Sequence, residues 1–211
     1  MIGAMAERRG GEAAPPTTTS TVRGEDWYAR DLSGQEFRNV EFVDLDLTEA
    51  SGVGAVFEEC VFRHAKLNAS VHTDAAFINC TFARSNFFDV RFERCKMIGS
   101  RFDDCAWDLA KIEGGNWSFV GLARADLHSA SFTGVRLREA DLSGVRAAGG
   151  TLRDCDLAGA WWERADLTGC DLRGSDLAGL DPAAVVLDRA IITLPQAVMI
   201  VEAMGLDLRV D

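Results

Sequence analysis

The sequence has no run of 18 apolar residues, the length that a membrane-spanning helix requires, so no transmembrane segment is expected. Its first 26 residues also lack the apolar core of a signal peptide. We therefore expect a cytoplasmic protein whose six cysteines stay reduced. Positive charge is scarce, because 22 Lys and Arg stand against 33 Asp and Glu and give a net charge of −11. This balance disfavours direct contact with nucleic acid or anionic membrane and favours a partner with a basic surface.

The residue patterns that carry catalysis or metal binding are missing as well. There is no C-x-x-C pair, and His64, His72 and His128 have no matching ligand spacing, so neither a zinc site nor a redox site is expected. Glycine-containing stretches lack the spacing of a phosphate-binding loop. Serines and threonines are scattered without an ordered base beside them. We therefore expect no enzymatic activity, no metal and no other cofactor.

What the sequence does contain is a column of large apolar residues that recurs every five positions. Thirty residues between 32 and 177 have numbers that end in 2 or 7, and ten of them are Phe, twelve are Leu and five are Met, Ile or Trp. Only Gly52, His72 and Ala147 break the pattern, and we expect irregular backbone at these three positions. A period of five fits neither a helix nor a strand. It indicates an internal repeat.

A second column lies two residues before the first. Ala, Cys, Ser, Gly or Val occupies 27 of its 30 positions. All six cysteines fall in this column, which indicates small buried residues rather than metal ligands or redox centres. Residues two apart on an extended chain point the same way. Each unit of five therefore directs one large and one small side chain inward and leaves three residues outside, at a bend.

The resulting consensus, A(D/N)LXX, resembles the pentapeptide-repeat family over about 150 of the 211 residues. The resemblance implies an all-β solenoid, a right-handed quadrilateral β-helix in which four repeats close one coil of 20 residues. Thirty repeats predict about 7.5 coils, stacked at the spacing of hydrogen-bonded strands. The predicted organisation is a disordered N-terminal tail (1–25), a β-helix (26–180) and a C-terminal cap with a dimerisation segment (181–211).

The C-terminal segment predicts a helix that covers the open end of the solenoid. Pro195 suits the first helical turn and Gly205 suits the stop. The helix between them is apolar on most of its surface, more than a solvated terminal helix needs. We therefore expect a homodimer through this helix. The candidate interface residues are Leu194, Val198, Met199, Val201, Met204, Leu206 and Leu208.

Two segments resemble one subgroup of the pentapeptide-repeat family. The ending LPQAVMIVEAMGLDL is similar to the C-terminal helix of Qnr/MfpA-type pentapeptide proteins, and residues 90–115 resemble the mid-rod segment of that subgroup, its albicidin-resistance member most of all. The resemblance implies a mimic of duplex DNA that binds DNA gyrase or topoisomerase IV. Such a protein modulates the enzyme or protects it from quinolones or other poisons, in antibiotic resistance or self-immunity.

The regular register of the repeats leaves alternatives to this function open. Some Qnr proteins carry protective loops that project from the coils, whereas this chain keeps its register without insertion. The resemblance therefore implies topoisomerase binding more directly than quinolone protection. The alternative is a structural or scaffolding protein with an unrelated protein partner.

The outward positions give a candidate contact surface. When they are sorted into four sides of a 20-residue coil, the side containing Leu47, Phe87 and Leu127 carries six acidic and two basic residues, a net charge of −4. The other three sides come to −1, −2 and −1. We predict that this most acidic side contacts the topoisomerase. Its acidic residues are Asp46, Glu49, Asp89, Asp108, Asp126 and Asp166.

Overall fold

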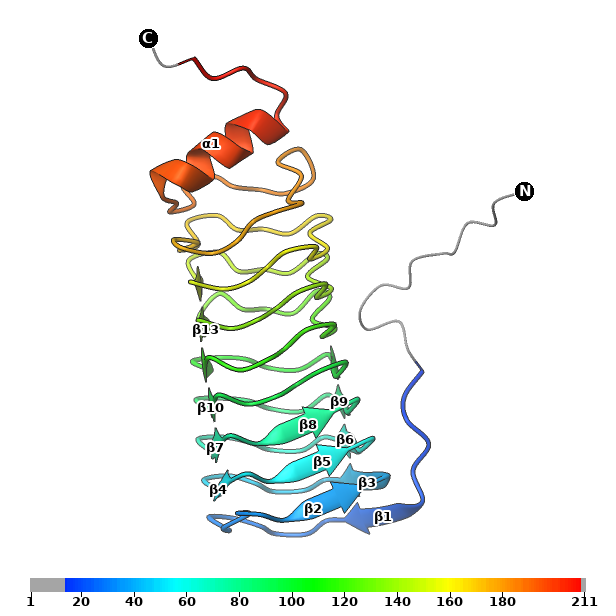
Figure 1. Cartoon of the computed structure of the whole chain (residues 1–211). Coiled ribbons are helices and arrows are strands. Elements are labelled where there is room, and N and C mark those ends of the chain that lie inside the picture. The colour runs from blue at the N-terminus through cyan, green and yellow to red at the C-terminus, as the bar shows by residue number, and fades with distance from the viewer. Residues whose placement is uncertain (1–13, 210–211) are drawn as a thin grey trace, which may run out of the picture.

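The backbone winds into a four-sided rod of stacked coils, with one helix across its C-terminal end (Figure 1). The computed structural model describes residues 14–209. Side 1 is a parallel sheet of β1 (Ser20–Arg23), β3 (Val40–Val43), β6 (Val61–Arg63), β9 (Thr81–Ala83) and β11 (Arg101–Asp103). Side 3 contains β4 (Ser51–Val53), β7 (Val71–Thr73), β10 (Arg91–Glu93), β12 (Lys111–Glu113), β13 (Ser131–Thr133) and β14 (Thr151–Arg153). Side 4 contains β2 (Glu36–Arg38), β5 (Val56–Glu58) and β8 (Ala76–Ile78).

Side 2 is held by single parallel backbone bridges instead of strands. It consists of residues 26–29 and of the segments that follow at intervals of 20, up to 186–189. Here as on the other sides, each residue pairs with the residue 20 positions further along, as Asp46 does with Lys66 and Phe62 with Phe82. The predicted four-sided β-helix of pentapeptide units is thus confirmed.

The predicted irregular backbone at the three interrupted positions is wrong. Gly52 and His72 pair in register between β4 and β7, and the amide of Ala147 donates to the Asp166 carbonyl over 2.8 Å. The reason is that backbone groups hold the coils together, so a missing large side chain leaves these bonds intact. The backbone adapts instead at Gly115, whose φ of +90° fits only glycine because a Cβ would meet the Cys95 carbonyl oxygen.

The corners of the rod use a conformation that the sequence pattern did not reveal. The last residue of most units, with a number ending in 4 or 9, has a positive φ, as in Asn39 (53°), Asp74 (51°) and Gly99 (66°). Gly, Asn and Asp adopt this left-handed region readily, whereas larger residues are strained in it. Many corners carry Gly, Asn or Asp, but larger residues such as Arg84 and Leu109 occupy others.

The interior is filled by columns of side chains that stack along the rod. Phe42, Phe62, Phe82 and Phe102 lie in one such column, with ring centroids 4.9, 4.6 and 4.9 Å apart. These distances are those of stacked aromatic pairs. Further along the chain leucines such as Leu142 replace them, and all are buried. The packing thus changes from aromatic to aliphatic along the rod without a change in the path of the backbone.

The small inward residues contribute hydrogen bonds as well as space. The Ser100 hydroxyl donates to the Phe77 carbonyl over 2.8 Å, and the Cys95 thiol donates to the His72 carbonyl over 3.2 Å. Each acceptor lies 23 residues earlier, in the preceding coil. The same bond to the preceding coil is made by Ser175 and by four further cysteines, Cys60, Cys80, Cys105 and Cys155.

The N-terminal segment differs from its prediction as a disordered tail. Strand β1 lies within the predicted tail (1–25) and pairs with β3, with Ser20 opposite Val40. The amide of Thr19 also donates to the Asn39 carbonyl over 2.7 Å. Ordered β structure therefore begins near Ser20, because this segment completes the first side of the first coil. The remainder of the tail prediction, for residues 1–13, lies outside the described residues.

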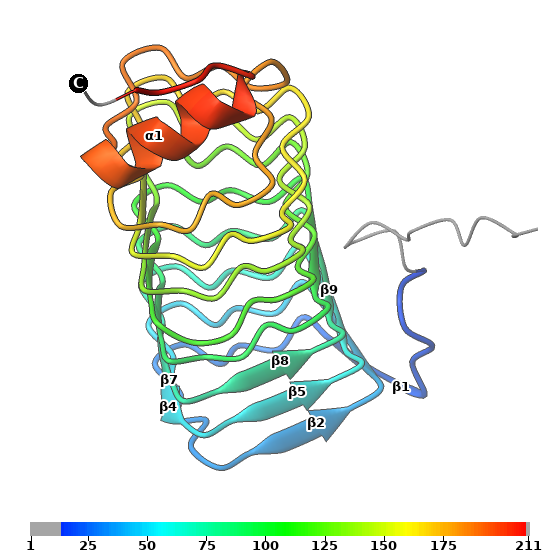
Figure 2. The same ribbon diagram turned by 45° about the horizontal axis from the view of Figure 1, so that its top comes forward.

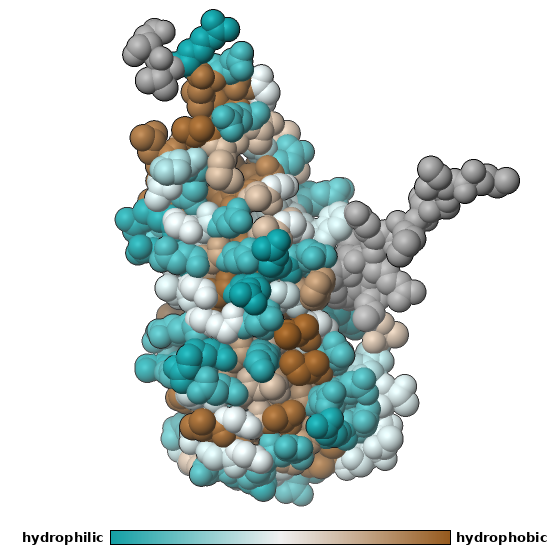
Figure 3. Space-filling model, viewed as in Figure 1, coloured by the Kyte–Doolittle hydropathy of each residue, from teal (hydrophilic) through white to brown (hydrophobic). Residues whose placement is uncertain are grey.

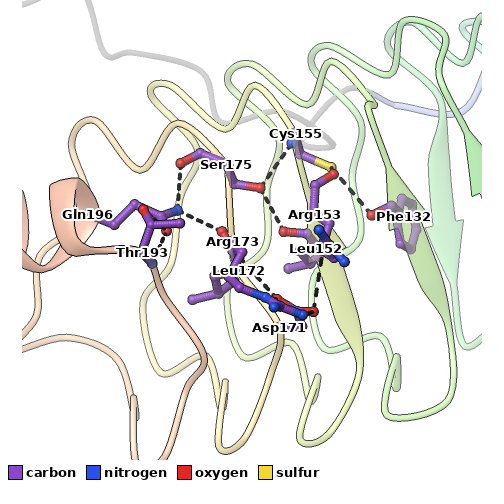
Figure 4. Close-up of polar contacts among 10 residues, drawn as sticks. All are labelled: Phe132, Leu152, Arg153, Cys155, Asp171, Leu172, Arg173, Ser175, Thr193 and Gln196. Atoms are coloured by element: carbon purple, nitrogen blue, oxygen red, sulfur yellow. Dashed lines mark hydrogen bonds and ion pairs between the residues drawn. The ribbon is translucent and has the colours of Figure 1, made fainter.

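Helix α1 (Leu194–Ala203) crosses the C-terminal end of the rod (Figure 2). The buried side chain of Gln196 fastens it there (Figure 4). Its amide nitrogen donates to the carbonyls of Leu172 and Ser175 over 2.6 and 2.8 Å, and its amide oxygen accepts from the Thr193 backbone N–H over 2.8 Å. One residue thereby starts the helix and joins it to the last complete coil.

Removing this amide should release the helix from the rod. We expect Gln196→Ala to lower the free energy of unfolding of the cap by about 1–3 kcal/mol, because two buried carbonyls lose their donor. Hydrogen exchange of residues 172–203 measures the effect, and Glu202→Ala, at an exposed position of the same helix, is the control. Unchanged exchange in Gln196→Ala would contradict this role.

The buried histidine should make stability depend on pH. Burial lowers the pKa of His72 from 6.5 to about 4, its Nε2 lies 3.1 Å from the Ser70 hydroxyl, and its Nδ1 has no partner among the described residues. Between pH 6.5 and about 4, His72 binds a proton in the unfolded chain but stays neutral in the folded protein. We therefore expect stability to be complete above pH 6.5 and to fall by about 3 kcal/mol as the pH drops toward 4.

Urea unfolding of wild type and His72→Leu at several pH values tests this. The difference in free energy of unfolding between the two proteins should shift in favour of His72→Leu as the pH falls from 7 to about 4.5. His128→Gln, at an exposed position, is the control. A difference that stays constant with pH would show that His72 does not cause the effect.

Candidate functional site

The structure brings the six predicted acidic residues onto side 2 of the rod. Backbone bridges join Asp126 to Arg146 and Arg146 to Asp166, and the amide of Asp89 donates to the Asp108 carbonyl over 2.9 Å. Asp26 and Asp188 extend the same side toward both ends. Side 2 therefore carries eight Asp and Glu against three Lys and Arg. Side 4, by comparison, carries six against four.

Basic side chains on neighbouring coils pair with part of this acidic surface. The Lys66 ammonium lies 3.2 Å from Asp46, and the Arg146 guanidinium lies 3.0 Å from Asp126. Lys111 reaches across the corner from side 3 to within 3.3 Å of Asp89. Exposed pairs of this kind contribute little to stability, but each reduces the negative charge that a partner meets.

The remaining acidic residues differ in their partners. The Tyr28 hydroxyl donates to Glu49 over 2.9 Å, and the Thr168 backbone N–H donates to Asp166 over 3.0 Å. Within residues 14–209, Glu49, Asp108 and Asp166 have no basic side chain within ion-pair distance. These three carboxylates therefore present the least compensated negative charge of the predicted set.

Local hydrogen bonds keep several of these carboxylates ionised. The Thr168 hydroxyl and backbone N–H lower the pKa of Asp166, and Thr48 together with Lys66 lowers the pKa of Asp46 despite partial burial. Partial burial raises the pKa of Asp126, but hydrogen bonds from His128 and Arg146 outweigh it, so this pKa also lies below its ordinary value. Side 2 is consequently anionic at neutral pH and remains so under mild acid.

Two large apolar residues in the middle of side 2 were missed by the sequence analysis. Phe88 is 44% exposed and Leu109 is 50% exposed, and they lie on adjacent coils in the middle of the rod. Sorting outward positions by charge alone overlooked them. Their numbers, ending in 8 and 9, already place them outside the two inward columns, and this signal is readable in the sequence.

Side 4 offers a different surface. Figure 3 shows it from the front, with hydrophilic residues interspersed among hydrophobic ones. Arg138 and Arg136 approach the same carboxylate, Asp156, at 3.3 and 3.9 Å. Phe119 is exposed at the corner of this side. Side 4 therefore combines charges of both signs, unlike the acidic side 2.

The groups that might carry chemistry are held in structural roles. Burial raises the pKa of Cys95 and Cys155 to about 11 and that of Cys105 and Cys170 to about 12, so these thiols stay protonated and unreactive at neutral pH. Across residues 14–209, His, Cys, Asp and Glu side chains form no group of three that could hold a metal ion. In the same part of the chain no helix has the length and hydrophobicity to cross a membrane.

The predicted dimer residues lie at the C-terminal end of the rod. Leu194 is 79% exposed, and five of the other six are also exposed, while Val201 is half-buried against its own chain. Helix α1 turns Gln196 and Ile200 toward the rod, so the residues between them face outward. The exposed members are Leu194, Val198, Met199, Met204, Leu206 and Leu208.

Comparison with known proteins agrees with this architecture. Residues 110–146, 121–157 and 151–181 match the model of pentapeptide repeats, in eight copies. A trypsin-treated variant of QnrB1, a plasmid-mediated fluoroquinolone resistance protein, has a similar structure with a TM-score of 0.64 and 21% identity, over 92% of this chain and 99% of that one.

A second solved structure shares the fold less closely. It is HetL, a pentapeptide-repeat protein involved in heterocyst differentiation regulation in Nostoc sp. strain PCC 7120. Its TM-score is 0.50 and its identity 16%, over 86% of this chain and 90% of that one. No curated protein matches this chain by sequence. At these identities the structural likeness establishes the fold alone.

Proposed function

Because this chain is a pentapeptide-repeat protein, we propose that it binds another protein through side 2 and that this partner is DNA gyrase or topoisomerase IV. The observation that carries the proposal is the charge of side 2, where eight acidic residues oppose three basic ones. An acidic rod suits a basic surface that normally receives DNA. Binding there modulates the enzyme or shields it from a poison.

The dimensions of the rod are compatible with this role. Side 2 contains nine segments from 26–29 to 186–189, so it is about 38 Å long at the spacing of neighbouring strands. A homodimer through α1 would roughly double that length. The exposed apolar residues of the cap support such a dimer, because a contiguous apolar surface at the end of a rod is stabilised by a second copy.

Protection from fluoroquinolones, the activity named for QnrB1, is one form that this function takes. Protection from poisons of other chemistry, such as albicidin, is the second form of this function. A topoisomerase assay with and without each poison distinguishes them, because protection restores supercoiling whereas simple competition with DNA reduces it.

A scaffolding role with an unrelated partner is the second candidate. It is favoured by the ion pairs of side 2, because Asp46, Asp89 and Asp126 each have a basic neighbour and resemble DNA less than their number suggests. The fold shared with HetL, a protein of developmental regulation, is consistent with this role. Recovery of one other protein and no topoisomerase in a pull-down would support it.

A pair of charge changes tests side 2 as the contact surface. In gyrase supercoiling and binding assays we expect Asp108→Lys with Asp166→Asn to weaken binding about tenfold or more, because two carboxylates without a basic neighbour are lost. Asparagine keeps the acceptor for the Thr168 amide and so preserves the corner.

The matched control makes the same charge changes on other sides. Glu113→Lys with Asp176→Asn alters sides 3 and 4, and Asp176 accepts from the Ala178 amide as Asp166 does from Thr168. Equal losses in both double variants would contradict a specific role of side 2. Absence of any effect of the wild-type protein on gyrase, with or without poison, would contradict the proposed partner.

The dimer has its own test. We expect Val198→Glu with Met199→Glu to convert a dimer into a monomer at about 10 µM protein, because charges at an apolar interface lose their solvation. Light scattering coupled to gel filtration measures the mass. Phe119→Glu, exposed on the side of the rod, is the control and should leave the mass unchanged. A monomeric wild type would rule out this interface.

A further inference from the structure

Two exposed apolar residues in the middle of side 2, Phe88 and Leu109, lie on adjacent coils within its acidic surface, whereas Tyr28 and Val186 are exposed near its two ends. The amide of Asp89 donates to the Asp108 carbonyl over 2.9 Å, so the Phe88–Asp89 pair of one coil is stacked against the Asp108–Leu109 pair of the next. The apolar and acidic residues therefore alternate across two coils. A surface that imitated only the charges of a phosphate backbone would not require exposed apolar side chains.

Leu109 is unfavourable for the stability of the isolated protein in two respects. Its side chain is half exposed, and its φ of 59° lies in the left-handed region, where a leucine is strained. Most equivalent corner positions carry Gly or polar residues, which tolerate the conformation or the solvent better. Phe119 on side 4 shares this exposure and conformation, so the feature that distinguishes Leu109 is its place beside Phe88 and the carboxylates of side 2.

Charge alone also falls short of imitating DNA. Side 2 has a net charge of −5 over about 38 Å, whereas duplex DNA of that length carries roughly 22 negative charges. Neighbouring basic residues further reduce the charge of Asp46, Asp89 and Asp126. Tight binding through this side therefore needs a contribution that is not electrostatic, and a buried apolar contact supplies one.

We propose that Phe88 and Leu109 form the apolar centre of the side 2 interface and insert into an apolar site within a basic groove of the partner protein. This inference rests on the proposed function, because it names the contact by which the same surface recognises its partner. The surrounding carboxylates, Asp108 above all, orient the rod against the basic groove. The apolar pair sets the dissociation rate of the complex.

A glycine substitution separates binding from folding. Leu109→Gly removes the apolar side chain at a corner where the backbone suits glycine, so the melting temperature should stay within about 3 °C of wild type. We expect its binding to purified gyrase to be about 30-fold weaker and that of Phe88→Ser about tenfold weaker, the range found for central interface residues.

The chain offers a matched control in Phe119. It is 45% exposed with a φ of 62°, close to the 50% and 59° of Leu109, but it lies on side 4. Phe119→Gly should therefore bind gyrase within about twofold of wild type. In addition, the loss caused by Leu109→Gly should persist between about 0.05 and 0.3 M salt, whereas a loss caused by charge removal shrinks.

The outcomes separate this inference from the proposed function. If wild type binds gyrase and Leu109→Gly binds equally well, the apolar centre is wrong while side 2 can still act by charge. Equal losses in Leu109→Gly and Phe119→Gly, or a loss that disappears with salt, overturn it as well. If wild type does not bind gyrase, the proposed function fails, and the assignment of a gyrase contact to Phe88 and Leu109 fails with it.

Discussion

The parallel backbone pairing of residues 20 apart determines everything else in this protein. It holds Phe62 beside Phe82 inside and Asp46 beside Lys66 outside, so a residue's number alone gives its side and its depth. Each coil buries its inward residues only against its neighbours, as in other solenoids. The outer surface consequently contributes little to the fold. This separation leaves the outward residues free to serve recognition, since few of them are needed for folding.

The interior could be predicted from the sequence because its signal is periodic. The columns of large and small residues predicted which side chains point inward, and five of the six cysteines are buried, with Cys105 half-buried. The four-sided shape of the coil came from the resemblance that this pattern carries. The left-handed corners were not predicted, because residues as different as Asn39 and Leu109 occupy them. Gln196 was missed although Thr193-x-x-Gln196 is a capping-box sequence, since its main partners lie 24 and 21 residues away in the last coil.

The candidate surface was predictable in outline only. Counting charges by side selected six acidic residues that do share one side, but the count could not show which of them meet a basic neighbour. Those pairings depend on side-chain reach between coils, and in the case of Lys111 and Asp89 on reach around a corner. A count of charges also gave no weight to Phe88 and Leu109. The structure therefore shows side 2 as an acidic surface with two exposed apolar residues in its middle, where the charge count had described a uniform acidic strip.

The stacking that creates an acidic side also limits how closely it can imitate DNA. Carboxylates directly above one another at the spacing of about 4.8 Å would repel, and basic residues placed between them, as Lys66 is beside Asp46 and Arg146 beside Asp126, relieve that repulsion. The same neighbours reduce the net charge below that of a nucleic acid of equal length. A regular β-helix that recognises a basic groove therefore has to add contacts that DNA does not make. An exposed apolar pair is the contribution that this rod can make without disturbing its register, because backbone groups hold the coils and outward side chains take no part in that ladder.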